Sequence, residues 1–226
     1  MISKQPRFDV VCFDCDSTLT SIEGIDELAD RAGFRREISV LTEAAMNGLV
    51  PLEEVYAKRL DIVRPDRAAL AWLAQRYADE TVSGAAETIA TLKRHGKALY
   101  VITGGLLQAV ADFTRSLGCS PEEVHAVKVH LDGAGTYQGF DTSSPLCRSN
   151  GKAVICRALA AKHGKVAMVG DGLTDLAARD GGAYVVGYGG VVQRDVLREK
   201  ADCYVSVPSL TATLPALLTE EELAGS

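Results

Sequence analysis

The sequence contains no apolar run of the roughly 18 residues that a membrane-spanning helix needs. The segment from Met1 to Pro6 is short and polar and lacks the apolar stretch of a secretory signal peptide, so we expect a cytoplasmic protein with no membrane partner. A basic excess is also missing, because 24 Lys and Arg stand against 30 Asp and Glu, for a net charge of -6. Nucleic-acid binders usually carry a basic face, so we expect no nucleic-acid partner.

Cysteines with zinc-ligand spacing are also lacking. The six cysteines are scattered, and only Cys12 and Cys15 lie close together, with no second Cys or His pair beside them. A structural zinc site usually needs four such ligands, so we expect no zinc and free thiols. The chain does have the material for a core, since 47% of its 226 residues are hydrophobic and 24% are charged. This composition excludes a disordered chain.

Hydrophobic patterning divides the chain into three parts. Phe8 to Phe13 is a short apolar run that predicts a buried strand. From Glu23 to about Tyr77 the apolar residues recur at helical spacing. After Ser83 the chain alternates between helical and strand patterns. This alternation predicts an α/β fold, in which helices flank a parallel sheet on both faces.

A purely helical stretch within an α/β chain indicates an inserted domain. We expect residues 1–20 and 82–226 to form an α/β catalytic core, and residues 21–81 to form a helical cap inserted after the first strand. Two alternating runs between Val124 and Phe140 flank turn residues and predict a β-hairpin. The predicted strand from Ala98 to Ile102 should end just before a Thr-Gly-Gly segment.

Two carboxylates follow the first predicted strand. Asp14 and Asp16 are one residue apart in the segment DCDST, at the strand end where open α/β sheets bind their ligands. Two carboxylates held this close repel each other unless a cation lies near them. Asp and Ser also favour solvated turns, so this segment alone is as compatible with an ordinary turn as with a metal site.

Two later predicted strands end in groups that suit an anion and a metal ion. Thr103 is followed by two glycines, whose N–H groups can approach an oxyanion closely. The segment GDGLTD carries Asp171 and Asp175 at the end of a further strand. Lys152 begins a predicted helix, where a cation is unfavourable with the helix dipole unless an anion is near. Taken singly, each piece also fits an ordinary turn, helix cap or solvated lysine.

Considered together, these strand ends predict one site for phosphoryl transfer. Asp14, Asp171 and the backbone carbonyl of Asp16 offer the hard oxygen ligands that Mg²⁺ prefers, so we expect Mg²⁺ as the cofactor. Lys152, Thr103 and nearby backbone amides would neutralise the remaining phosphate oxygens.

The segments DCDSTL, TGG and GDGLTD, with Lys152 between the last two, resemble in their order the four motifs of haloacid-dehalogenase phosphatases. The resemblance extends to the phosphoserine phosphatase family through EGIDELA (23–29), AMNGLVPL (45–52), KRL (58–60), GTYQGFD (135–141) and VGYGGVVQR (186–194). It implies a Rossmann-like haloacid-dehalogenase core with a small helical-bundle cap. It also implies a Mg²⁺-dependent enzyme that hydrolyses O-phospho-L-serine in serine biosynthesis.

The resemblance further implies a role for each matching residue. Asp14 would be the nucleophile that forms an aspartyl-phosphate, and Asp16 would be the general acid and then the general base. Asp14, Asp16 and Asp171 would hold the metal ion, with Asp175 supporting them from behind.

A second group of implied residues concerns the substrate. Glu23 and Arg59 match residues that hold an amino and a carboxylate group, although alone each would be taken for an ordinary helix residue. The other residues that the family pattern implies for binding substrate or phosphate are Met46, Thr103, Gly104, Gly105, Lys152 and Thr174.

Several positions leave the substrate open. Leu52 and Leu106 stand where the family commonly has Phe, and the segment beginning at Val127 also departs from the pattern. One alternative is a phosphatase or phosphotransferase that acts on another small phosphomonoester. A second is a receiver-like switch that is phosphorylated on Asp14, although Asp16 beside it could activate water. We expect a small phosphorylated metabolite as partner, with phospho-L-serine favoured, and a monomer or homodimer.

Overall fold

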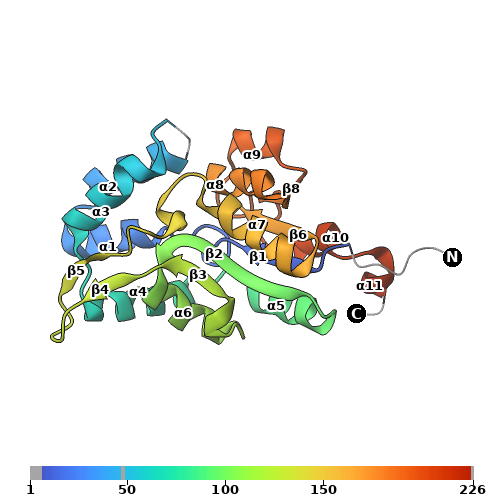
Figure 1. The fold of residues 1–226 in the computed structure, drawn as a ribbon, viewed down its shortest axis with the longest axis horizontal. Coiled ribbons are helices and arrows are strands. Elements are labelled where there is room, and N and C mark those ends of the chain that lie inside the picture. The colour runs from blue at the N-terminus through green and yellow to red at the C-terminus, as the bar shows by residue number, and fades with distance from the viewer. Residues whose placement is uncertain (1–6, 47–48, 225–226) are drawn as a thin grey trace.

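The structure is a computed structural model that describes residues 7–46 and 49–224. Its centre is a six-stranded parallel sheet with the strand order β3-β2-β1-β6-β7-β8 (Figure 1). The strands are β1 (Val10–Phe13), β2 (Ala98–Leu106), β3 (Val124–Val127), β6 (Val166–Gly170), β7 (Tyr184–Tyr188) and β8 (Cys203–Val205). The predicted α/β class and the Rossmann-like parallel sheet are confirmed.

Helices cover both faces of this sheet (Figure 1). On one face lie α7 (Gly151–His163), α8 (Leu173–Leu176) and α9 (Asp195–Lys200), and on the other lie α5 (Ala85–Arg94) and α6 (Leu107–Ser116). The two short helices α10 (Leu214–Leu217) and α11 (Glu220–Ala224) end the described chain. Every residue of β1 and β6 is buried, which explains why these central strands are continuously apolar instead of alternating.

Four helices lie between β1 and α5. They are α1 (Gly24–Ala32), α2 (Arg35–Met46), α3 (Leu52–Val63) and α4 (Arg67–Asp79). The Asp66 side chain accepts the Ala69 N–H and caps α4, as its position before the helical pattern predicts. Thr20 and Thr81 pair antiparallel where the chain leaves and rejoins the sheet region. We refer to residues 21–81 as the helical insert; the division into a core and a separate cap domain stays a prediction.

A β-hairpin lies beside the helical insert (Figure 1). Its strands are β4 (Val129–Leu131) and β5 (Tyr137–Phe140), and the Gly135 carbonyl in its turn accepts the N–H of Arg67 in α4. The hairpin is therefore confirmed from Val129 onward. The part of the predicted hairpin before Val129 was wrong, because Val124–Val127 pairs parallel with β2 as the edge strand of the main sheet.

The parallel strands bring the predicted site segments to one edge of the sheet. β1 pairs with β2 on one side and with β6 on the other, so Asp14 and Asp171 follow, and Thr103 lies near the end of, neighbouring strands that run in the same direction. The strand predicted to end at Ile102 continues as β2 to Leu106. Its pairing with β3 is irregular between Ile102 and Leu106, which is the stretch that contains the two glycines.

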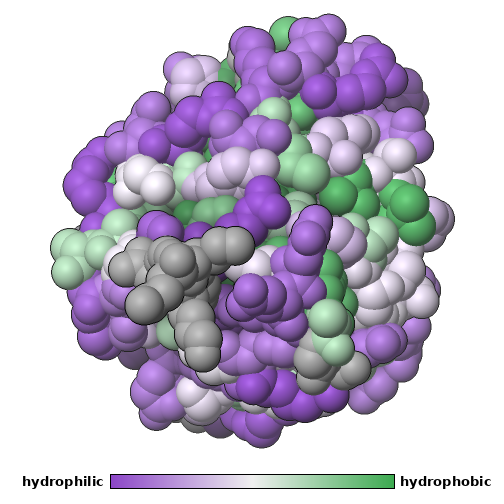
Figure 2. All heavy atoms as spheres, turned by 90° about the vertical axis from the view of Figure 1, so that its right-hand side faces the viewer, coloured by the Kyte–Doolittle hydropathy of each residue, from purple (hydrophilic) through white to green (hydrophobic). Residues whose placement is uncertain are grey.

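The face seen in Figure 2, on the side of α10 and α11, is mostly hydrophilic, with hydrophobic side chains in smaller spots between the polar ones. Among the residues that the structure describes, no helix has both the length and the apolar character needed to cross a membrane.

Candidate active site

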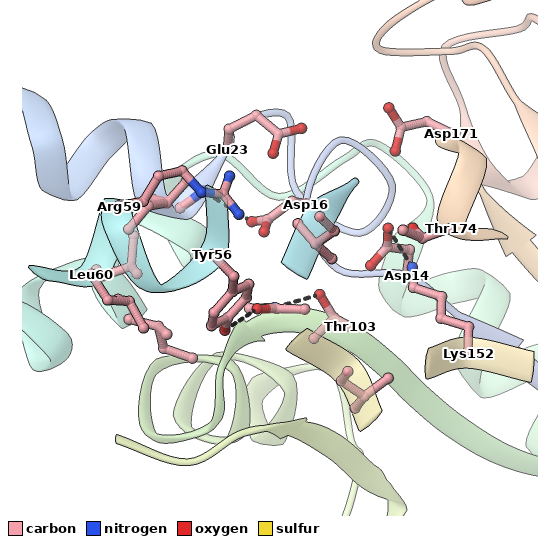
Figure 3. A pocket seen from close by; sticks show the side chains of 18 of the residues that line it. Asp14, Asp16, Glu23, Tyr56, Arg59, Leu60, Thr103, Lys152, Asp171 and Thr174 are labelled. Atoms are coloured by element: carbon pink, nitrogen blue, oxygen red, sulfur yellow. Dashed lines mark hydrogen bonds and ion pairs between the residues drawn. The ribbon is translucent and has the colours of Figure 1, made fainter. Parts of the chain in front are cut away.

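A buried ion-pair cluster lies at the carboxyl end of the sheet. The Lys152 ammonium is 2.7 Å from Oδ2 of Asp14 (Figure 3). It is also 2.6 Å from Oδ1 of Asp175. Burial alone would lower the pKa of Lys152, but the two carboxylates outweigh it and the pKa lies above its usual value. Gly151 lets the start of α7 pass directly against the Pro145 carbonyl, where a Cβ atom would clash.

The loop after β1 fixes Asp14 from the other side. The Cys15 N–H donates to Oδ1 of Asp14 at 2.7 Å, so each carboxylate oxygen has its own donor. The Cys15 carbonyl in turn accepts the N–H groups of Thr18, Leu19 and Thr20. Ser17 has a φ of 52°, a left-handed conformation that few non-glycine residues adopt. These bonds hold the DCDST segment in one tight turn that presents Asp14 and Asp16 to the pocket.

The pocket has a strand end, with Asp14, Lys152 and Asp171, and an insert end, with Glu23 and Arg59. Asp16 lies between these two ends (Figure 3). Its Oδ1 accepts the Gly24 N–H at 3.0 Å, which joins the loop to the start of α1. Burial, and then the charge of Asp14, raise the pKa of Asp16 to about 7. A carboxyl group with a pKa near neutrality can both donate and accept a proton, as a general acid-base catalyst must.

Glu23 and Arg59 face the pocket from the helical insert (Figure 3). The Ser17 hydroxyl donates to Oε1 of Glu23 at 2.8 Å. Burial and the charge of Asp16 raise the pKa of Glu23 to about 8, so a cation beside this carboxylate would be strongly stabilising.

Arg59 is 4% exposed, although its sequence context is that of an ordinary helix residue. Its Nη1 donates to Oγ1 of Thr42 at 3.1 Å, and burial lowers the pKa of the guanidinium. Its buried Nε has no hydrogen-bond partner among the described residues. A buried guanidinium with an unused donor is costly, and an anion would offset that cost.

Three buried carboxylates lie close enough to bind a metal ion together. Asp14, Asp171 and Asp175 each place one oxygen within 4.8 Å of the others. Burial and neighbouring carboxylates, Glu23 first among them, raise the pKa of Asp171 well above its usual value. Lys152 contacts two of these acids and Arg194 contacts Asp171, and the hard oxygens of the three acids fit a magnesium-type ion.

Asp175 differs from the other two acids in lying outside the pocket lining. One of its oxygens is bonded to Lys152 and the other accepts the Gly172 N–H at 2.9 Å. Gly170 makes room for this carboxylate, since a Cβ atom there would clash with it. Asp175 therefore holds Lys152 and the loop from outside the pocket lining, whereas Asp14 and Asp171 line the pocket, where a metal ion would bind.

The structure places the residues that were predicted for the site as follows. The pocket is lined by Asp14, Asp16, Glu23, Arg59, Thr103, Gly104, Gly105, Lys152, Asp171 and Thr174. Asp175 lies behind Lys152, outside this lining. Met46 is the last residue of α2, and its side chain lies outside the described part of the structure.

Several residues contact the site without having been singled out from the sequence, among them four with polar or charged side chains. Tyr56 lies three residues before Arg59 on the same face of α3, so helical spacing could have found it. Arg194 closes the family-like segment VGYGGVVQR, and its Nε is 3.2 Å from Oδ2 of Asp171. Thr42, bonded to Arg59, and Arg148, in the pocket lining, carry no comparable signal in the sequence.

Comparison with known proteins agrees with this geometry. The sequence model of the haloacid dehalogenase-like hydrolases matches residues 8–179. A phosphoserine phosphatase from Drosophila melanogaster is 34% identical over 200 residues, which cover 87% of this chain and 74% of that protein.

Two solved structures resemble the fold closely. A substrate-bound phosphoserine phosphatase complex superposes with a TM-score of 0.81 at 25% identity, covering 94% of this chain and 100% of the other. A phosphoserine phosphatase with an analogue of its phospho-aspartyl intermediate gives a TM-score of 0.79 at 27% identity, covering 93% and 99%. The chain is therefore a phosphoric monoester hydrolase that belongs to the haloacid dehalogenase-like hydrolases and, within them, to the phosphoserine phosphatase family.

Proposed function

We propose that this protein hydrolyses O-phospho-L-serine to L-serine and phosphate, with Asp14 as a covalent nucleophile and Mg²⁺ as the cofactor. The observation that carries the proposal is the buried Arg59, whose Nε has no partner among the described residues and which faces the same pocket as Asp14. A pocket with a phosphate-type cluster at one end and an unpaired cation at the other suits a phosphate ester that carries a carboxylate.

In the first step an oxygen of Asp14 attacks phosphorus and the bond from phosphorus to the serine oxygen breaks. Asp16, whose pKa burial and the Asp14 charge raise, gives its proton to the departing oxygen. Lys152 pairs with the attacking carboxylate and meets the phosphate charge. The products of this step are L-serine and phosphorylated Asp14.

In the second step water attacks the phosphorus atom of phosphorylated Asp14. Asp16, now a carboxylate, takes a proton from that water, the bond between Asp14 and phosphorus breaks, and phosphate leaves. The same side chain thus serves both steps in opposite protonation states. This chemistry distinguishes the protein from a receiver-like switch, in which the phosphorylated aspartate persists.

The metal ion completes the charge balance at this end. Mg²⁺, held by Asp14, Asp171 and the backbone carbonyl of Asp16, would supply positive charge that offsets phosphate and carboxylate together. Asp175 supports the site by fixing Lys152.

The amino-acid part of the substrate would bind at the insert end. Arg59 would pair with the carboxylate, and its free Nε supplies the donor for it. Glu23 would pair with the ammonium, which would supply the cation that its raised pKa calls for. Thr103, Thr174 and the amides of Gly104 and Gly105 would bind phosphate. The reaction would release L-serine for biosynthesis.

The test is phosphate release in the presence of Mg²⁺ from a matched panel of esters. Phospho-L-serine should give the highest kcat/KM. Phosphoethanolamine lacks only the carboxylate and 3-phosphooxypropanoate lacks only the ammonium, so each should fall well below it. An equal kcat/KM for all three esters would contradict the phosphoserine assignment while leaving the phosphatase chemistry intact. Absence of turnover with every ester would contradict both.

A further inference from the structure

Tyr56 joins the helical insert to the phosphate end of the pocket. It lies on α3, and its hydroxyl donates to the Gly104 carbonyl in β2 at 2.7 Å (Figure 3). The ring is 5% exposed and packs against Phe140 of the hairpin, with ring centroids 5.2 Å apart. Three segments distant in sequence therefore meet at one side chain.

The Tyr56 hydroxyl donates to the carbonyl of a peptide group whose N–H also forms a hydrogen bond. The Gly104 carbonyl and the Gly105 N–H belong to the same peptide plane, and the Gly105 N–H donates to Oγ1 of Thr103 at 3.0 Å (Figure 3). Glycines on both sides give this peptide little steric restraint of its own. Its orientation therefore depends on the two hydrogen bonds at its ends.

The orientation of that peptide decides what the Thr103 hydroxyl can do. A hydroxyl has one proton to donate, and Thr103 already accepts the Gly105 N–H. No donated bond from this hydroxyl is present among the residues that the structure describes, although the side chain is 1% exposed. Its proton thus remains for a ligand in the pocket that Thr103 lines.

We propose that Tyr56 is a positioning residue for phosphate binding, which acts through the Gly104–Gly105 peptide to aim the Thr103 hydroxyl at the phosphate group. The hydrogen bond to the carbonyl fixes the peptide plane and polarises its N–H, and the N–H in turn fixes Thr103. This inference rests on the proposed phosphatase function, since it needs a phosphate group in the pocket.

The position of Tyr56 on its helix links the two ends of the pocket. Arg59 follows one turn later, with its guanidinium carbon 5.7 Å from the Tyr56 ring centroid. The helix that would bind the substrate carboxylate therefore also holds the phosphate-binding segment in place.

The Tyr56→Phe variant tests the proposal, because it removes the hydroxyl and keeps the buried ring. We expect kcat/KM to fall about tenfold for both phospho-L-serine and p-nitrophenyl phosphate, the size of one lost hydrogen bond. The inhibition constant of inorganic phosphate should rise by a similar factor. Tyr137→Phe is the matched control, since Tyr137 is buried in the hairpin with no partner for its hydroxyl among the described residues, and it should change none of these values.

A double-mutant cycle separates positioning from simple packing. If Tyr56 acts through Thr103, Tyr56→Phe should have no further effect in a Thr103→Val background. Additive losses would overturn the proposal, as would a lower melting temperature for Tyr56→Phe with unchanged kinetics and phosphate inhibition. An active wild type with an unaffected Tyr56→Phe variant would contradict this inference alone, whereas a wild type inactive on both esters would contradict the proposed function.

Discussion

The two ends of the pocket differ in how far their charged groups are already satisfied. At the strand end, Lys152 contacts two carboxylates, and both oxygens of Asp14 and of Asp175 have a donor. At the insert end, Arg59 has an unused Nε, and Glu23 accepts the Ser17 hydroxyl but forms no ion pair, among the residues that the structure describes. One end is assembled before substrate arrives, and the other is completed by it.

This difference assigns separate tasks to the two ends. A preassembled cluster treats every phosphate ester alike, because its contacts do not depend on the rest of the substrate. An end with unpaired buried charges discriminates, because a ligand without the matching charges leaves them unpaired. Changes at the strand end should therefore affect all esters, whereas changes at the insert end should affect phospho-L-serine selectively.

The largest effect is expected from Asp14→Asn, at the strand end. An amide oxygen is a poor nucleophile and a weaker metal ligand, and this enzyme class can accelerate its reaction by up to about 10²¹-fold. Turnover of every ester should fall by many orders of magnitude. Asp112→Asn, the same change in an exposed ion pair on α6, should leave the rate unchanged. Near-normal turnover of the Asp14 variant would exclude it as the nucleophile.

Asp16→Asn should remove both proton transfers, which are typically worth about 10²- to 10⁴-fold each. Phospho-L-serine has a poor leaving group and should stall at the first step. The p-nitrophenolate group leaves without a proton, so p-nitrophenyl phosphate should release about one equivalent of p-nitrophenol per enzyme and then stop. Rapid-mixing absorbance measures that burst. Steady release without a burst would show that Asp16 is not needed to activate water.

Arg59→Ala tests the insert end. Removing one partner of a buried ion pair costs about 3–5 kcal/mol, which corresponds to about two to four decades in kcat/KM for phospho-L-serine. Turnover of p-nitrophenyl phosphate, which has no carboxylate, should change little. The ratio of the two kcat/KM values in one variant is its own control. Equal losses on both substrates would remove the distinction between the two ends.

Removal of the metal ion should expose the repulsion among the buried carboxylates of the pocket. Burial first, and neighbouring carboxylates next, raise the pKa of Asp16 to about 7, that of Glu23 to about 8, and that of Asp171 well above its usual value. The unfolded chain titrates these acids near pH 4, so the folded metal-free protein binds more protons and loses stability as pH rises through 7 and 8. His125, whose pKa burial lowers, acts in the opposite direction, but only below about pH 6.5.

The melting temperature of the chelator-treated protein should therefore fall between pH 6.5 and 8.5, and Mg²⁺ should raise it more at pH 8.5. Scanning calorimetry at constant ionic strength measures both effects. Asp171→Asn, which removes one acid and one proposed ligand, should weaken the pH slope and the response to Mg²⁺ together. An equal rise with Mg²⁺ at both pH values would contradict this account.

The same division explains what could be predicted from the sequence. Asp14, Thr103 and Asp171 directly follow or belong to strands of one parallel sheet, so identifying the strands was enough to bring them together. The extension of β2 through Thr103 to Leu106 was missed, because Gly-Gly is typical of turns, whereas here β2 continues past the glycines and pairs again with β3 at Leu106.

The insert end could not be derived in this way. Helical spacing gives the face of a helix but not the partner that it meets, so Arg59 alone looked like a solvated residue, and only family resemblance indicated its role. The contacts of Tyr56 with Gly104 and of Thr42 with Arg59 depend on how helices pack on each other and on the sheet. Packing of that kind is set by the whole core and leaves no local motif.

The smallest effect is expected from a change at Thr42, which lies in the helical insert. The buried Thr42 hydroxyl donates to Oδ1 of Asp26 at 2.8 Å and accepts from Nη1 of Arg59 at 3.1 Å, so it aims the guanidinium at the pocket. Thr42→Val should raise KM for phospho-L-serine up to about tenfold with little change in kcat or in p-nitrophenyl phosphate turnover, because one hydrogen bond that orients substrate binding is lost.

Two further variants isolate the contribution of Thr42 to binding. Thr42→Ser keeps the hydroxyl and should restore KM. Thr114→Val removes a buried hydroxyl that, like that of Thr42, bonds the carbonyl four residues earlier, but it lies on α6 away from the pocket lining and should leave KM unchanged. If Thr42→Val instead lowered kcat on both substrates, the insert end would be shaping the phosphate site as well, and the separation of tasks between the two ends would not hold.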